Sequence, residues 1–461
     1  MHASSVLPGA LRLRSALLLA FFFATAMGYY HLKIFLPRAQ AVNAAEGLGN
    51  GYFFGGDFYP IWRTSKEWRL HQLDPYSSSM TQTIQTGLFG RSLDACNPND
   101  PPLRYREFSY PAFVDILALP STWFPFPVVR IAGASIILLM TVAGIVLWMG
   151  ILEIRFSLAL CTIVILLTLF SYPVLEGITA VQVGLAVSFL LAASLMMLRS
   201  GLELPAGYVL ALTTIKPQMT MLVIGCLLLW ALSEWRQRWQ FAAGLVSGVA
   251  VLYLSATFVS TSWLAQWLHV LFGYGSYSQP PLPIYLFGIQ IGTTFSVVLL
   301  AVAVILAWHI RHVPAKSSEF TLTIGILLAI GVVVLLPGQA VYDHILLLPG
   351  VLLLLRPEGK PVLRNRVTRV VLALTAAAIA WQWIAAVALL AASFLVARLS
   401  DTWALLPIRT AASVPFAVLA GLGLLLRSSG TSGKMKARAF QKSSPIPRGS
   451  LESPRVPGRD C

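Results

Sequence analysis

Apolar stretches long enough to cross a lipid bilayer recur along almost the whole chain, and they constrain its fold more than any other feature. Hydrophobic residues make up 57% of the chain and charged residues only 11%, too few to cover a water-soluble surface. Because one spanning helix needs about 20 apolar residues, the sequence predicts an all-α polytopic membrane protein of about 10–12 transmembrane helices. The expected segments are 15–35, 129–151, 157–174, 179–198, 206–215, 219–232, 240–260, 284–309, 320–336, 341–355, 369–397 and 403–426.

The first apolar stretch could pass for a signal peptide, because Arg12 and Arg14 precede it. Its apolar run continues to Phe35, beyond the usual length of a signal sequence, and no convincing cleavage site of small residues follows. We interpret it as a retained membrane anchor.

The basic residues of the short loops predict the orientation, since Lys and Arg are retained on the cytoplasmic side. A cytoplasmic N-terminus places all the basic short loops inside, from Arg155 to Arg366. Both termini are then cytoplasmic, and residues 38–128 form a long extracytoplasmic loop. We expect one membrane domain over residues 1–426, followed by a basic disordered tail at 427–461.

The long loop is the expected place for function, because loops of such length in a compact protein are commonly functional. Within it, residues 108–124 are mostly apolar but contain Pro111 and Pro120 and are followed by Pro125, which is typical of an interfacial helix. Residues 263–271, with Trp263 and Trp267 among leucines, have the same character. Together these two segments could cover a cavity at the extracytoplasmic surface.

The run Gly-Gly-Asp-Phe-Tyr at residues 55–59 is the most informative part of the loop. Two glycines allow a tight turn that presents Asp57 close to the membrane. The alternative is that Asp57 caps a helix that begins near Tyr59, which is a common role for Asp. Spacing alone favours the cap. Asp74, followed by Pro75, indicates a turn.

Lys216 interrupts an apolar run together with Pro217, which breaks a helix. A lysine at membrane depth is costly and therefore suggests function, such as holding a lipid phosphate. The alternative is a side chain that extends to the membrane interface.

Asp343 and His344 open the last Leu-rich run before residue 356. A carboxylate beside an imidazole could carry out proton chemistry or orient a substrate. Asp343 could equally be a helix cap with a surface histidine beside it. Gln182, inside an apolar segment, could form an interhelical hydrogen bond and nothing more.

Taken together, these elements resemble glycosyltransferase family 87 of the GT-C class, the polyprenyl-phosphate-mannose-dependent mannosyltransferases. The resemblance extends from about residue 57 to residue 355. It rests on the order of Asp57-Phe58, Asp74-Pro75-Tyr76, Tyr110-Pro111, Gln182, Ile215-Lys216-Pro217-Gln218 and Tyr342-Asp343-His344.

The resemblance implies an enzyme that transfers a hexose, in the first instance mannose, from a polyprenyl-phosphate donor to a lipid-linked or cell-envelope acceptor outside the cytoplasm. It makes Asp57 the general base and Lys216 the group that binds the donor phosphate. It places His344 near donor or acceptor. The remaining substrate-binding or supporting residues are Asp343, Asp74, Tyr110, Gln182 and Gln218.

Composition agrees with a lipid-borne donor, because we find neither an Asp-x-Asp motif nor a glycine-rich phosphate loop for a nucleotide sugar. The four cysteines, among them Cys96 in the loop, show no spacing for a disulfide framework or metal cluster. We expect no metal and no cofactor. The net charge of +15 lies in short loops and the tail, which indicates membrane lipids as partners and not nucleic acid.

A second hypothesis is a transporter or flippase for a lipid-linked sugar, which many spans and an intramembrane cation would suit. No repeated half with matching helix breaks is apparent, although inverted repeats can be weak. A third is a non-catalytic assembly subunit. The acidic residue at the start of a large extracytoplasmic loop favours the enzyme over both.

Overall fold

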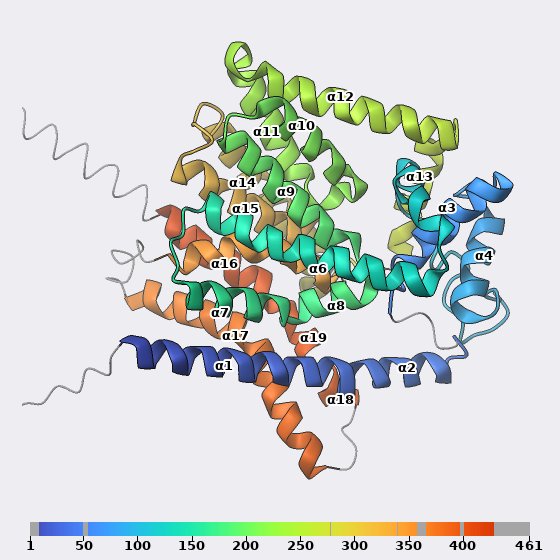
Figure 1. The fold of residues 1–461 in the computed structure, drawn as a ribbon, viewed down its shortest axis with the longest axis horizontal. Helices are drawn as coiled ribbons and strands as arrows, with labels where there is room; N and C mark the ends of the chain where they lie inside the picture. Colours follow the sequence, from blue (N-terminus) through green and yellow to red (C-terminus); the bar gives the residue numbers. More distant parts are fainter. Residues whose placement is uncertain are drawn as a thin grey trace, which may run out of the picture.

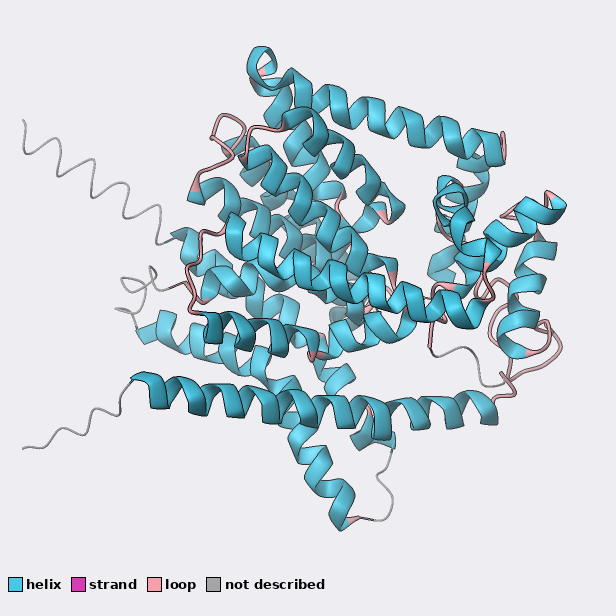
Figure 2. Ribbon diagram, viewed as in Figure 1, coloured by secondary structure: helices cyan, strands magenta, loops and turns pink. Residues whose placement is uncertain are grey.

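The computed structural model describes residues 9–48, 54–276, 278–338, 340–356, 366–396 and 401–427. Within these residues the regular secondary structure is helical, as Figure 2 shows. The one exception among them is an isolated β-bridge between Pro281 and Pro337. The predicted all-α class is therefore confirmed. The basic tail expected after residue 427 lies outside the described residues.

Six helical stretches are long and apolar enough to cross a membrane, and a bent pair makes a seventh. The first contains α1 (Gly9–Tyr29), a π-helical turn (Tyr30–Phe35) and α2 (Leu36–Ala45). The next four are α6 (Phe126–Ile151), α12 (Trp235–Val259), α14 (Leu282–His309) and α17 (Arg366–Leu395). The last, Leu406–Arg427, contains α19 (Leu406–Ala411) and follows the short α18 (Asp401–Ala404). The bent pair is α7 (Leu158–Leu169) and α8 (Tyr172–Ala180), with 60° between them.

Shorter apolar helices fill the interior between these stretches. They are α9 (Val183–Arg199), α10 (Glu203–Leu212), α11 (Met221–Ser233), α15 (Ser318–Val334) and α16 (Leu348–Leu354). Every residue of 320–334 in α15 is buried, so this helix forms the centre of the hydrophobic core. A helix that is apolar all round is stable only when it is enclosed in this way.

Figure 1 shows α1 and α2 as one long rod along one edge of the bundle and α12 along the opposite edge. The helices of the long loop gather with α13 (Trp263–Gly273) at one end of the bundle. These loop helices are α3 (Tyr59–His71), α4 (Ser78–Phe89), α5 (Phe113–Ala118) and a 3-10 helix (Leu119–Trp123). The segments expected as interfacial helices, 108–124 and 263–271, are thus helical over most of their length.

The first helix continues past residue 38, where we expected the polar loop to start, and ends at Ala45. Pro37 lies in the first turn of α2 and directly follows the π-helical turn. A proline has no N–H to donate to a helical hydrogen bond. The π-helical turn before it has a different hydrogen-bond pattern, so the helix can continue through Pro37. The apolar pattern alone did not indicate this continuation.

The predicted segments 157–174 and 179–198 have different ends in the structure. The chain bends at residues 170–171 because Ser171 precedes a new helix with Pro173 in its first turn, where proline is tolerated. A second break lies at Val181, whose φ of +54° is left-handed and ends α8. Gln182 is therefore the N-cap of α9 and lies at a helix end, not inside a span.

Candidate functional site

The turn before α3 holds Asp57 against the end of α8. Gly55 has a φ of +87°, and a Cβ built there would lie 2.8 Å from the Cβ of Arg130, so only glycine fits. Its N–H donates to the carbonyl of Thr179 at 2.8 Å, and the N–H of Asp57 donates to the carbonyl of Ala180 at 3.2 Å. The predicted glycine turn is confirmed.

The carboxylate of Asp57 does not cap α3, so that alternative is wrong. The N-cap of α3 is Phe58, which makes no side-chain cap. Instead Arg106 donates from Nη1 to Oδ1 of Asp57 at 2.8 Å, and Gln182 donates from Nε2 to Oδ2 at 2.8 Å. Tyr110 in turn donates its hydroxyl to Oε1 of Gln182 at 3.3 Å. The loop at 106–110 and the start of α9 thus meet at one carboxylate.

This carboxylate lies in the wall of a polar cavity of about 280 Å³, which we call the Asp57 cavity. The turn at 57–60 and the loop at 105–110 form one part of its wall. Residues of α8, the start of α9, the turn after α13 and the segment before α16 form the rest. Its lining residues are Asp57, Pro60, Tyr105, Arg106, Glu107, Ser109, Tyr110, Glu176, Gln182, Tyr274, Ala340 and Tyr342. Asp57 keeps about 20% of its side chain exposed, so it is not fully enclosed by the protein.

Lys216 pairs with Asp343 beside this cavity. The Nζ atom lies 2.8 Å and 2.7 Å from the two carboxylate oxygens and 4.8 Å from the centre of the Tyr342 ring. Asp343 is fully buried and Lys216 nearly so, hence Lys216 does not extend to the interface and Asp343 is not a surface cap. Gly184, in the first turn of α9, leaves the room for the carboxylate, because a Cβ there would collide with Asp343 Oδ1.

The pair lines a smaller cavity of about 70 Å³ that shares a wall with the first. Tyr110, Gln182, Tyr274 and Tyr342 line both. Gln218 lines the smaller cavity. Asp57 and Lys216, expected to act together, thus line two different cavities whose walls share tyrosine and amide side chains.

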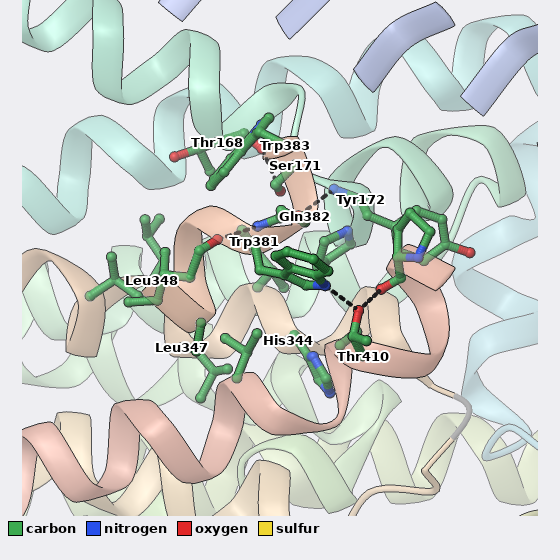
Figure 3. A pocket seen from close by; sticks show the side chains of 18 residues that line it. Thr168, Ser171, Tyr172, His344, Leu347, Leu348, Trp381, Gln382, Trp383 and Thr410 are labelled. Carbon is green, nitrogen blue, oxygen red and sulfur yellow. Dashed lines mark hydrogen bonds between the residues drawn. The ribbon is translucent and has the colours of Figure 1, made fainter. Parts of the chain in front are cut away.

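His344 lies elsewhere. It lines a mostly apolar cavity of about 110 Å³ between the segment before α16, α8 and α17, and Figure 3 shows it below Trp381 and close to Thr410. Its neighbour Asp343 belongs to the smaller cavity described above, so the two residues of this motif line different cavities.

Asp74 also lies away from the Asp57 cavity. One carboxylate oxygen accepts from the N–H of Tyr76 at 2.8 Å, which confirms the predicted turn, and the other accepts from Nε2 of Gln266 at 2.9 Å. Gln266 belongs to α13, so Asp74 attaches the start of α4 to that helix. This is a supporting position.

Arg106, Glu176, Tyr274 and Tyr342 line the cavity, and sequence reasoning did not select them as site residues. Burial opposes the charge of Arg106, but Tyr105 and the Asp57 carboxylate beside it raise its pKa above the usual value. Burial and the nearby Asp57 charge raise the pKa of Tyr274 to about 12, so its hydroxyl is a hydrogen-bond donor at neutral pH. The sequence signals were the charged run at 104–107 for Arg106 and a carboxylate in an apolar stretch for Glu176.

Among the described residues, no group of three or more His, Cys, Asp or Glu side chains is arranged to hold a metal ion.

Comparison with protein-family models gives a match to Glycosyltransferase family 87 over residues 108–337. The matched range contains Tyr110, Gln182, Lys216 and Gln218 and ends shortly before Asp343. Searches of curated proteins and of solved structures find no significant match. The described helices include six or seven candidate membrane spans, in agreement with a multi-pass membrane protein. The chain therefore belongs to glycosyltransferase family 87, a GT-C family, and is a membrane glycosyltransferase.

Proposed function

We propose that the protein transfers a hexose, mannose in the first instance, from a polyprenyl-phosphate donor to a hydroxyl of a lipid-linked or cell-envelope acceptor, with Asp57 as the general base. The observation that carries the proposal is the position of Asp57 in the polar cavity, held by Arg106 and Gln182. These donors position the carboxylate before the substrates bind, and Gln182 can keep it in place for proton transfer when Arg106 turns to the donor phosphate.

In this reaction the acceptor oxygen attacks the anomeric carbon of the donor and a new C–O bond forms. The bond between the anomeric carbon and the phosphate oxygen breaks, and its electron pair leaves with the polyprenyl phosphate. The hydroxyl proton passes to a carboxylate oxygen of Asp57. The residue therefore has to face the acceptor, and the cations have to face the leaving phosphate.

Two cations can stabilise that phosphate. Arg106 lines the Asp57 cavity, and Lys216 lines the smaller cavity beside it. An ammonium has three donors, and Asp343 accepts from Lys216 with two oxygens, so one N–H remains for a phosphate oxygen. Arg106 can exchange Asp57 for the incoming phosphate, a partner that a guanidinium binds well, and this exchange would free Oδ1 of Asp57 for the acceptor.

We also propose that both termini are cytoplasmic and that the cavity faces the other side. The basic short loops contact one another at one end of the bundle. Arg199 donates to the carbonyl of Ala315 at 3.0 Å, and Arg238 donates to the carbonyl of Arg311 at 2.8 Å. These contacts bring the short loop after α9 and the start of α12 to the short loop after α14, which supports the orientation that the positive-inside rule gives.

The function can be tested with purified protein in lipid nanodiscs, labelled polyprenyl-phosphate mannose and acceptor membranes. We expect label in the acceptor with this donor and none with a nucleotide-linked mannose. If the protein only moved the intact donor across sealed vesicles, without labelled product, the transporter hypothesis would replace this one.

A further inference from the structure

A second polar cavity, of about 430 Å³, lies between α4 and α13. Its lining comes from residues 76–107 and 266–270, outside all the helices long enough to span a membrane. The volume falls within the range of about 300–1,000 Å³ that is common for small-molecule sites.

The cavity borders the Asp57 cavity through the loop at 104–107. Glu107 lines both cavities, and Arg104 lines only the second while Arg106 lines only the first. The two therefore lie on opposite sides of one short segment. A ligand long enough to pass Glu107 would occupy both.

The chemistry of the lining fits a neutral, polyhydroxylated ligand. Ser78, Thr81 and Gln82 contribute hydroxyl and amide groups from one face of α4, and Leu103 and Val270 contribute apolar surface. Sugar rings have hydroxyl groups at their edges and apolar C–H groups on their faces. The polar side chains can bind the hydroxyl groups, and the apolar side chains can pack against the faces.

The same lining argues against a phosphate or a lipid chain. The guanidinium of Arg104 pairs with Glu107 at 3.0 Å, so its charge is already compensated. A prenyl or acyl chain would have to leave the bilayer to reach a cavity that no spanning helix lines.

The walls are held in place before any ligand binds. Gln85 donates from Nε2 to the carbonyls of Leu103 and Tyr105 at 2.7 Å and 3.0 Å and accepts from the N–H of Leu93 at 3.2 Å. On the other side, Asp74 accepts from Gln266 of α13. A preformed site avoids part of the entropic cost of binding.

We infer that this cavity binds the saccharide part of the acceptor, beyond the sugar that reacts at Asp57. The inference rests on the proposed function and adds to it the substrate class: the acceptor already carries at least one further sugar unit. Such an acceptor would pass Glu107 with its reactive hydroxyl at Asp57 and its remaining units against α4.

Two neighbouring serines provide a matched test. Ser78 lines the cavity and Ser79 does not, and both are exposed in the first turn of α4. Ser78→Trp would fill the cavity, whereas Ser79→Trp would place the same side chain outside it at a similar cost to folding.

The measurement is the Kd of octyl glycosides with one, two and three hexose units, in a mannosyl and a glucosyl series, to each protein in nanodiscs. We expect at least a tenfold gain in affinity from one to three units, in at least one series, for the wild type and Ser79→Trp, and no gain for Ser78→Trp. Equal affinity for all lengths in the wild type, or an equal gain in both variants, would overturn the inference. Because this readout is binding, it is independent of whether polyprenyl-phosphate mannose is the donor, which the transfer assay decides.

Discussion

Arg106 shows how much one residue can contribute to a site. Its φ of +69° is unusual for a residue other than glycine, and such a conformation costs of order 1–3 kcal/mol. The ion pair with Asp57 and the ring of Tyr105, 5.3 Å from its guanidinium, hold it there. Strain held by surrounding contacts is common at functional sites, which supports a direct part for Arg106 in substrate binding.

Arg106→Gln should weaken donor binding. A hydrogen bond to a charged group contributes about 1.5–3 kcal/mol, so we expect the donor KM to rise about tenfold or more. The matched control is Arg63→Gln, which removes an arginine paired with Glu67 on α3, outside the residues that line the cavity. Steady-state kinetics of sugar transfer would measure both. A donor KM that is unchanged in Arg106→Gln would count against the phosphate contact.

Asp57 could be found from the sequence because the two glycines before it indicate a turn, and local patterns of this kind do not depend on distant contacts. Arg106 could not, because its left-handed conformation has no signature in a run of ordinary residues. The pair of Lys216 with Asp343 joins residues 127 positions apart, and no local pattern reports such a partner. The sequence therefore identified Asp57, Lys216 and Asp343 but neither Arg106 nor the pairing of these charged groups.

At the scale of the helices, the pair of Lys216 and Asp343 joins the break between α10 and α11 to the segment before α16. The break consists of two short 3-10 turns, Thr213–Ile215 and Pro217–Met219. The carboxylate also lies against Gly184 of α9. One buried ion pair thus fixes several elements around the smaller cavity.

Lys216→Met should destabilise the fold, because removing one partner of a buried pair leaves an uncompensated charge and costs about 3–5 kcal/mol. The double variant Lys216→Met with Asp343→Asn should recover most of this loss. Thermal unfolding of the purified proteins in one detergent would show it. Additive losses in the double variant would contradict the coupling of the two side chains.

Helix ends were harder to predict than helix positions. The apolar stretches that begin at 129, 240 and 284 each contain a helix, but α1 and α2 continue through a π turn and α7 bends into α8. These changes depend on Pro37, Pro173 and the left-handed Val181, whose effect depends on the local backbone. Hydropathy does not contain that information.

At the scale of the whole molecule, the long loop, α13 and the Asp57 cavity lie at one end of the bundle, and the contacts among basic loops lie elsewhere. Separation of this kind makes the orientation testable with a natural cysteine. Cys96 is exposed in the long loop, whereas Cys226 is buried.

A membrane-impermeant maleimide applied to intact cells should label the protein at Cys96. The Cys96→Ser variant should not be labelled in intact cells. After lysis, this variant should be labelled only at its other cysteines. Labelling of Cys96 only after lysis would place the long loop in the cytoplasm and reverse the proposed orientation.

The central claim is that Asp57 removes the proton from the acceptor hydroxyl, and the most direct test is the kcat of transfer for Asp57→Asn beside Asp94→Asn. Asp94 is an exposed carboxylate of the same loop and lies outside the cavity. General-base catalysis contributes about 10²–10⁴-fold, so kcat should fall by that factor in Asp57→Asn and stay within about twofold of the wild type in Asp94→Asn. Retention of full kcat in a folded Asp57→Asn protein would contradict the account.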